Sequence, residues 1–145
     1  MTSKVYVALR VKATPQRAFA AFVDEIGAWW RPSVLFQTTP RPGRLSFEPG
    51  EGGKVFEIGR IRVWEPPHRL VFAWRQASFP LDLHTEVEVA FQAVGEETRV
   101  SVEHRGFDQV PVGNAARHRF PDEVLLMRLA DYWRSQLAAV GERLG

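Results

Sequence analysis

Residues 121–144 read PDEVLLMRLADYWRSQLAAVGERL, and the pattern in this stretch limits how the rest of the chain can be arranged. Its apolar side chains recur at steps of three and four residues, which predicts an amphipathic helix of about six turns. The acidic pair Asp122-Glu123 stands where the positive end of the helix dipole would lie. The predicted apolar face consists of Leu126, Leu129, Trp133, Leu137, Val140 and Leu144. A helix of this length with one apolar face needs a broad apolar surface to lie on.

Segments of alternating apolar and polar residues can provide that surface, because such alternation is typical of strands with one buried side. The predicted strands are 4–12, 54–65, 69–76, 83–93 and 98–107. The side chains predicted to face the helix from four of these strands are Val5, Val7, Leu9, Val11, Leu70, Phe72, Trp74, Thr85, Val87, Val89, Phe91, Ala93, Thr98, Val100, Val102 and His104. Short turns join most of these strands, so we expect an antiparallel sheet.

Two short helices are predicted after the first strand. Thr14-Pro15 has the hydroxyl cap and the proline that commonly begin a helix, which we expect over 15–23. A second short helical turn is expected near 24–30. The following proline- and glycine-rich residues predict a loop with short edge strands at 34–38 and 44–48.

The predicted fold class is therefore α+β. We expect a curved antiparallel sheet of six to seven strands wrapped around a long C-terminal helix, with two short helices after the first strand. The sequence has 145 residues, the usual size of one domain, and we expect a single domain over 1–145.

Composition argues against several kinds of site and partner. The absence of cysteine excludes disulfides, thiolate zinc sites and a cysteine nucleophile. The net charge is +2 and no basic tract occurs, so we do not expect nucleic acid as a partner. No apolar run is long enough to insert into a membrane. The N-terminal residues alternate instead of forming the apolar block of a signal peptide, which favours a cytoplasmic protein.

Motifs for common catalytic chemistry are missing. The segment 50–54 (GEGGK) resembles a phosphate-binding loop, but Val55 follows it where a hydroxyl is required. Neither a G-x-S-x-G elbow nor an H-E-x-x-H zinc motif occurs. We therefore predict no catalytic residue, no cofactor and no metal.

Two ionisable residues share the predicted inner face. Glu57 and His104 would both enter an apolar interior, where an unpaired charge is costly. Three interpretations stay open: a structural placement at the sheet rim, polar groups that orient a ligand, and acid–base catalysis.

The tryptophans allow two interpretations as well. Trp74 and Trp133 point inward, where they can pack the core or line a cavity. Trp29 and Trp30 are adjacent, so one of them is expected to face the core while the other covers a cavity mouth or is exposed. With Phe36, this region is our candidate for a lid.

Several motifs in this order resemble those of a known superfamily. They are Trp29-Trp30, Gly52-Gly53, Gly59, the run 64–74 (WEPPHRLVFAW), 85–91, 97–100 (ETRV), 104–107 (HRGF), and Trp133 with Leu137. The chain resembles the START-like, helix-grip (SRPBCC) superfamily, and more narrowly the branch related to the C-terminal domain of the activator of Hsp90 ATPase. The resemblance implies an apolar cavity between the sheet and the long helix, where superfamily members hold lipids, hormones or polyketides. It also implies a chaperone as an alternative partner.

The function expected from these observations is binding of a small apolar or amphipathic molecule in that cavity, as a carrier or sensor. The predicted ligand-binding residues are Trp30, Phe36, Glu57, Phe72, Trp74, Val89, His104, Leu126 and Trp133. The alternatives are a partner-binding module related to Hsp90 co-chaperones, a homodimer included, and a polyketide-cyclase-like enzyme. A void well above about 300 Å³ would favour the ligand, and a filled interior the partner module.

Overall fold

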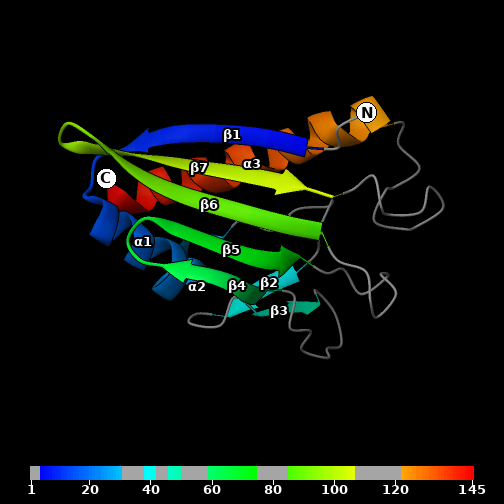
Figure 1. The fold of residues 1–145 in the computed structure, drawn as a ribbon, viewed down its shortest axis with the longest axis horizontal. Coiled ribbons are helices and arrows are strands. Elements are labelled where there is room, and N and C mark those ends of the chain that lie inside the picture. The colour runs from blue at the N-terminus through cyan, green and yellow to red at the C-terminus, as the bar shows by residue number, and fades with distance from the viewer. Residues whose placement is uncertain (1–3, 31–37, 42–45, 50–58, 75–84, 107–121) are drawn as a thin grey trace.

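The structure is a computed structural model that describes residues 4–30, 38–41, 46–49, 59–74, 85–106 and 122–145 (Figure 1). The strands are β1 (Lys4–Val11), β2 (Thr38–Arg41), β3 (Ser46–Pro49), β4 (Gly59–Glu65), β5 (Arg69–Trp74), β6 (Thr85–Val94) and β7 (Glu97–Arg105). The helices are α1 (Pro15–Asp24), α2 (Ile26–Trp29) and α3 (Asp122–Leu144).

The main sheet has five strands in the order β1-β7-β6-β5-β4, and all neighbours are antiparallel. The expected single sheet of six to seven strands is wrong for the described residues, because β2 and β3 pair with each other in a separate two-stranded sheet. Both lie later in the sequence than the predicted edge strands, and they are rich in proline, which cannot donate to a ladder.

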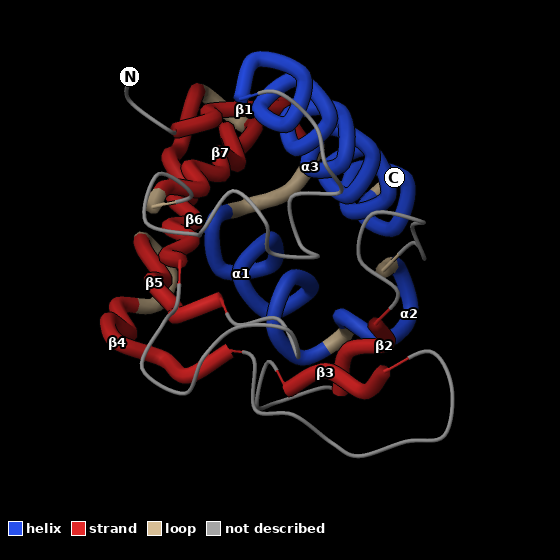
Figure 2. The backbone as a smooth tube through the Cα atoms, turned by 90° about the vertical axis from the view of Figure 1, so that its right-hand side faces the viewer, coloured by secondary structure: helices blue, strands red, loops and turns tan. Residues whose placement is uncertain are grey.

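Helix α3 lies across one face of the sheet, as the sequence predicts for a helix-grip fold (Figure 2). Its buried face is rotated slightly from the predicted one: Leu125 is fully buried, whereas Leu126 is only partly buried. The side chains of α3 in the core are Leu125, Leu129, Tyr132, Trp133, Gln136, Leu137, Ala139 and Val140. The helix therefore buries a broader stripe than spacing alone suggested, and that stripe includes an amide and a phenol.

Helix α1 packs under one end of the sheet. Its N-terminus is capped by the Thr14 hydroxyl, which accepts a hydrogen bond from the Arg17 backbone N–H at 3.2 Å. Phe19 and Phe22 meet Phe91 of β6, with ring centroids 5.2 and 6.0 Å apart. The Glu25 carboxylate that follows α1 accepts hydrogen bonds from Arg17 and from Arg143 at the end of α3. These contacts fasten the last turn of α3 to α1.

A β-bulge in β4 changes which side chains face inward. The pairing of β4 with β5 shifts between Ile61 and Val63, so Val63 lies opposite Val71 and Trp64 opposite Leu70. The bulge inserts one unpaired residue, so strict alternation over 54–65 does not hold in β4. Trp64 reaches the inner face at the sheet edge, where its ring meets Phe19 edge to face at 5.1 Å.

Two residues predicted to face inward are more exposed than expected. Leu9 is 37% exposed because it lies at the edge of β1 beside α3. Ala93 is exposed because β6 is about to turn into β7 at that point. Of the helices in the described part of the chain, none combines the length and apolar character needed to cross a membrane.

The contact between β1 and α3 yields a stability prediction. A Cβ added to Gly141 would lie 3.2 Å from Leu9 Cδ2, the movable end of a half-exposed side chain. Alanine favours a helix over glycine by about 1 kcal/mol, so Gly141→Ala should raise the free energy of unfolding by roughly 0.5 kcal/mol in urea denaturation. Gly141→Val, with branches that Leu9 cannot avoid, should lower it. A lower free energy of unfolding in Gly141→Ala would contradict this interpretation of the contact between Gly141 and Leu9.

Candidate ligand-binding site

A cluster of aromatic rings lies between the sheet and α3, and we call Trp30, Trp74, Tyr132 and Trp133 the ring cluster. Trp74 is the last residue of β5, and Trp30 directly follows α2. The Trp133 ring centroid lies 5.7 Å from that of Trp74 and 6.0 Å from that of Trp30. Tyr132 meets Trp133 at 5.3 Å and Trp30 at 6.0 Å, in both cases edge to face. Edge-to-face contacts between aromatic rings stabilise the fold beyond the burial of their apolar surface alone.

The two adjacent tryptophans have different environments. Trp29 is buried, and its indole N–H donates to the Ala21 carbonyl of α1 at 2.8 Å. Trp30 is half-buried and stacks on Trp74 with a centroid separation of 6.3 Å. Trp29 thus anchors α2, while Trp30 forms the more accessible side of the ring cluster.

His104 joins the ring cluster to the sheet. The Trp133 indole N–H donates to His104 Nδ1 at 3.0 Å, so Nδ1 carries no proton. The neutral ring then carries its proton on Nε2, which donates to Thr85 Oγ1 at 2.7 Å. The Thr85 hydroxyl in turn donates to the Trp74 carbonyl at 3.3 Å. A continuous chain of hydrogen bonds therefore links α3, β7, β6 and β5.

The protonation state of His104 follows from its burial. The side chain is 1% exposed. Loss of solvation, with a smaller contribution from the nearby charge of Arg105, lowers the pKa of His104 to about 3. Burial likewise raises the pKa of the Tyr132 phenol. Both groups are neutral near pH 7, so the arrangement orients hydrogen bonds and holds no charge in the interior.

The structure brings five of the predicted site residues into one neighbourhood. Trp30 and His104 each contact both Trp74 and Trp133, and Phe72 reaches Trp74 at 6.5 Å. Val89 is buried deeper in the sheet, opposite Leu70 and Val102. Leu126 is partly buried at the border of the core. Phe36 and Glu57 lie outside the described residues, and so does any pairing between Glu57 and His104.

Sequence reasoning missed two members of this neighbourhood. Tyr132 contacts three indoles, although it stands one position outside the predicted apolar stripe. The sequence signal for it was the series Leu125, Leu129, Tyr132 and Gln136, which also recurs at steps of four and three. Thr85 was placed on the inner face, but its hydrogen bond to His104 depends on strand register that alternation does not specify.

Comparison with known proteins assigns the chain to a protein family. A family model described as Activator of Hsp90 ATPase homolog 1-like protein matches residues 12–134. No curated protein matches the chain.

Solved structures share the fold. CalC from Micromonospora echinospora, described as a self-sacrificing resistance protein, is 25% identical, with 97% of this chain and 93% of that chain covered and a TM-score of 0.61. The Aha1 dimer from Colwellia psychrerythraea is 16% identical, with 97% and 95% covered and a TM-score of 0.64. An HSP90 activator from Plasmodium falciparum is 17% identical, with 90% and 86% covered and a TM-score of 0.57. Since the family model spans most of the chain, the protein belongs to the Activator of Hsp90 ATPase homolog 1-like family, a branch of the START-like (SRPBCC) superfamily.

Proposed function

We propose that the protein binds a small apolar or amphipathic molecule against the ring cluster, as a carrier or sensor. The observation that carries this proposal is the position of Trp30, a half-buried indole resting on three buried rings between the sheet and α3. Pockets for small molecules are lined mainly by apolar and aromatic side chains with a few placed polar groups, and this neighbourhood has that composition.

Binding would require Trp30 to move, because its ring now covers Trp74 and Trp133. Trp30 lies just beyond a helix of only four residues, and its backbone N–H is held by the Ile26 carbonyl at 3.0 Å. Trp29 is hydrogen-bonded to α1, so a rotation of the Trp30 side chain would leave the packing of the core unchanged. Affinity would come from burying apolar ligand surface, at roughly 25 cal/mol per Å².

His104 has a supporting role in this proposal. Both ring nitrogens are engaged, by Trp133 and by Thr85, so the imidazole would hold the indole of Trp133 at a fixed angle and not contact the ligand directly.

The test uses protein purified from its own host. Native mass spectrometry and extraction should recover a retained small molecule, and a panel of lipids and polyketides should quench tryptophan fluorescence and raise the melting temperature. Trp30→Ala should weaken binding at least tenfold, which corresponds to about 1.4 kcal/mol.

Trp64→Ala is the matched control, because this indole is 49% exposed and lies on β4 against Phe19, outside the ring cluster. It should change affinity less than twofold. Protein recovered without any ligand, together with no thermal shift across the panel, would contradict the proposal and favour the partner-binding module.

A further inference from the structure

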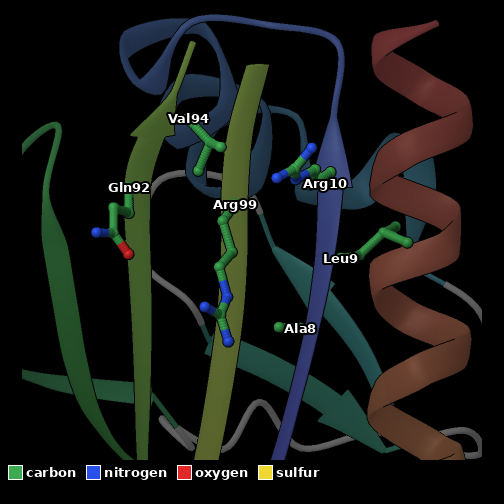
Figure 3. Close-up of a pocket in the computed structure, with 6 residues that line it drawn as sticks. All are labelled: Ala8, Leu9, Arg10, Gln92, Val94 and Arg99. Carbon is green, nitrogen blue, oxygen red and sulfur yellow. The ribbon is translucent and has the colours of Figure 1, made fainter.

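A shallow hollow of about 380 Å³ lies on the sheet, lined by Ala8, Leu9, Arg10, Gln92, Val94 and Arg99. Figure 3 shows Gln92, Arg99 and Arg10 on the adjacent strands β6, β7 and β1, while Leu9 points the other way, toward α3. The long polar side chains belong to the outer face, opposite the one that packs on α3. The hollow is therefore separate from the ring cluster.

Charge pairing elsewhere on this outer face is complementary. Arg105 contacts Glu86, and it also lies 3.2 Å from Glu88 and 3.1 Å from Glu103. Lys4 Nζ lies 3.9 Å from Glu103, and Arg69 Nε lies 3.8 Å from Glu88. Cations opposite carboxylates across strands are the arrangement expected of a solvated sheet surface.

The cross-strand row of residues that borders the hollow does not place cations opposite carboxylates. Arg10 of β1 and Arg99 of β7 are direct cross-strand partners, and Gln92 of β6 is the partner of Arg99 on its other side. Like charges directly opposite each other destabilise a sheet. Arg10 forms an ion pair with Glu97 at 3.7 Å, comparable to the pairs of Lys4 and Arg69, so the cation of this row that lacks a carboxylate in the described part of the chain is Arg99. Within the described ranges, no carboxylate lies within 4 Å of the Arg99 guanidinium.

Arg99 is positioned without being neutralised. Its Nη2 donates to the Tyr6 hydroxyl at 3.0 Å, and its Cζ lies 5.8 Å from the centre of the Tyr6 ring. The next row of the same face is Ala90, Ser101 and Ala8, whose short side chains leave space beside the arginines. A guanidinium has five donors in a fixed fork, so one bond to Tyr6 leaves donors for a second acceptor.

We infer that this hollow binds a phosphate group. Two guanidiniums on adjacent strands would share one dianionic oxyanion, which would remove the repulsion between them and accept charge-assisted hydrogen bonds from both. The Gln92 amide would add a neutral donor from the third strand. A phosphate monoester of a small soluble molecule and the headgroup of an anionic lipid present the same chemistry, and the test below separates these two sources.

The probes are inorganic pyrophosphate and phenyl phosphate, added to the full-length chain in a low-salt buffer free of phosphate and sulfate. Backbone NMR signals of Arg10, Gln92 and Arg99 should shift together with one dissociation constant. Arg99→Gln and Arg10→Gln should each raise that constant at least tenfold. Arg134→Gln is the control, because Arg134 is an exposed arginine of α3 paired with Asp131 at 3.0 Å, and it should change the constant less than twofold.

Co-sedimentation with lipid vesicles distinguishes a lipid headgroup from a small soluble phosphate monoester. Co-sedimentation with phosphatidic acid vesicles but not phosphatidylcholine vesicles, lost in Arg99→Gln, would assign the site to a lipid headgroup. Binding of the soluble probes without sedimentation would assign it to a small molecule. The inference is overturned if sodium chloride of equal ionic strength produces the same shifts, or if Arg134→Gln weakens binding as much as Arg99→Gln does.

Discussion

Replacing Trp133 by phenylalanine is expected to lower the free energy of unfolding by about 2–4 kcal/mol. The indole is fully buried, and its N–H is a donor to His104 Nδ1. Phenylalanine would leave that buried acceptor without the Trp133 donor, at a cost of about 1–3 kcal/mol, and the smaller ring would leave space beside Trp74. Urea denaturation monitored by circular dichroism measures the change.

The matched control for this substitution is Trp64→Phe at the half-exposed edge of β4, where the same chemical change should cost less than about 1 kcal/mol. A double substitution separates the hydrogen bond from the packing. With His104→Leu present, Trp133→Phe should cost clearly less than it does alone, because no acceptor is then left unsatisfied. Strict additivity of the two substitutions would show that the hydrogen bond does not contribute.

Acidification is the second large effect, and His104 causes it. The folded-state pKa of His104 is lowered to about 3, against about 6.5 for an unfolded chain. Between these values the unfolded state binds a proton that the folded state does not, so stability is complete above about pH 6.5 and falls as the pH drops toward 3. From pH 7 to pH 5 the loss should be about 2 kcal/mol.

Between pH 7 and pH 5 the ion pairs of Glu25 do not contribute to this slope. Hydrogen bonds from Arg17 and then Arg143 lower the pKa of Glu25 to about 2, so the ion pairs of Glu25 are lost only at lower pH. His104→Gln keeps an acceptor for Trp133 and a donor for Thr85 but does not titrate. Its unfolding free energy should change much less between pH 7 and pH 5 than that of the wild type. Equal slopes in wild type and His104→Gln would refute this assignment.

Much of the fold could be predicted because the strongest periodic signals belong to the buried elements. The stripe in 121–144 and the alternation in 83–93 and 98–107 identified α3, β6 and β7, including the turn between those two strands. The errors occur where local pattern and tertiary contact disagree. A bulge in β4 interrupts the alternation of that strand, and the extra strands formed their own small sheet.

The candidate site was predictable in composition but not in connectivity. Inward-facing aromatic residues could be assigned from alternation and helical spacing, which is why Trp74, Trp133 and His104 were expected to share the interior. The hydrogen bonds from Trp133 through His104 to Thr85 depend on ring orientation and tautomer, and a periodic pattern contains neither. The opposed arginines on the outer face depend on strand register in the same way.

The pairing of β1 has a consequence for synthesis on the ribosome. β1 is translated first among the described strands, yet its hydrogen-bonded neighbour is β7 and its helical neighbour is α3, both of which come much later in the sequence. Val5, Val7 and Val11 therefore stay uncovered in the nascent chain until β7 and α3 have emerged from the ribosome. A translation product that stalls before α3 would leave the apolar face of β1 exposed and prone to aggregation.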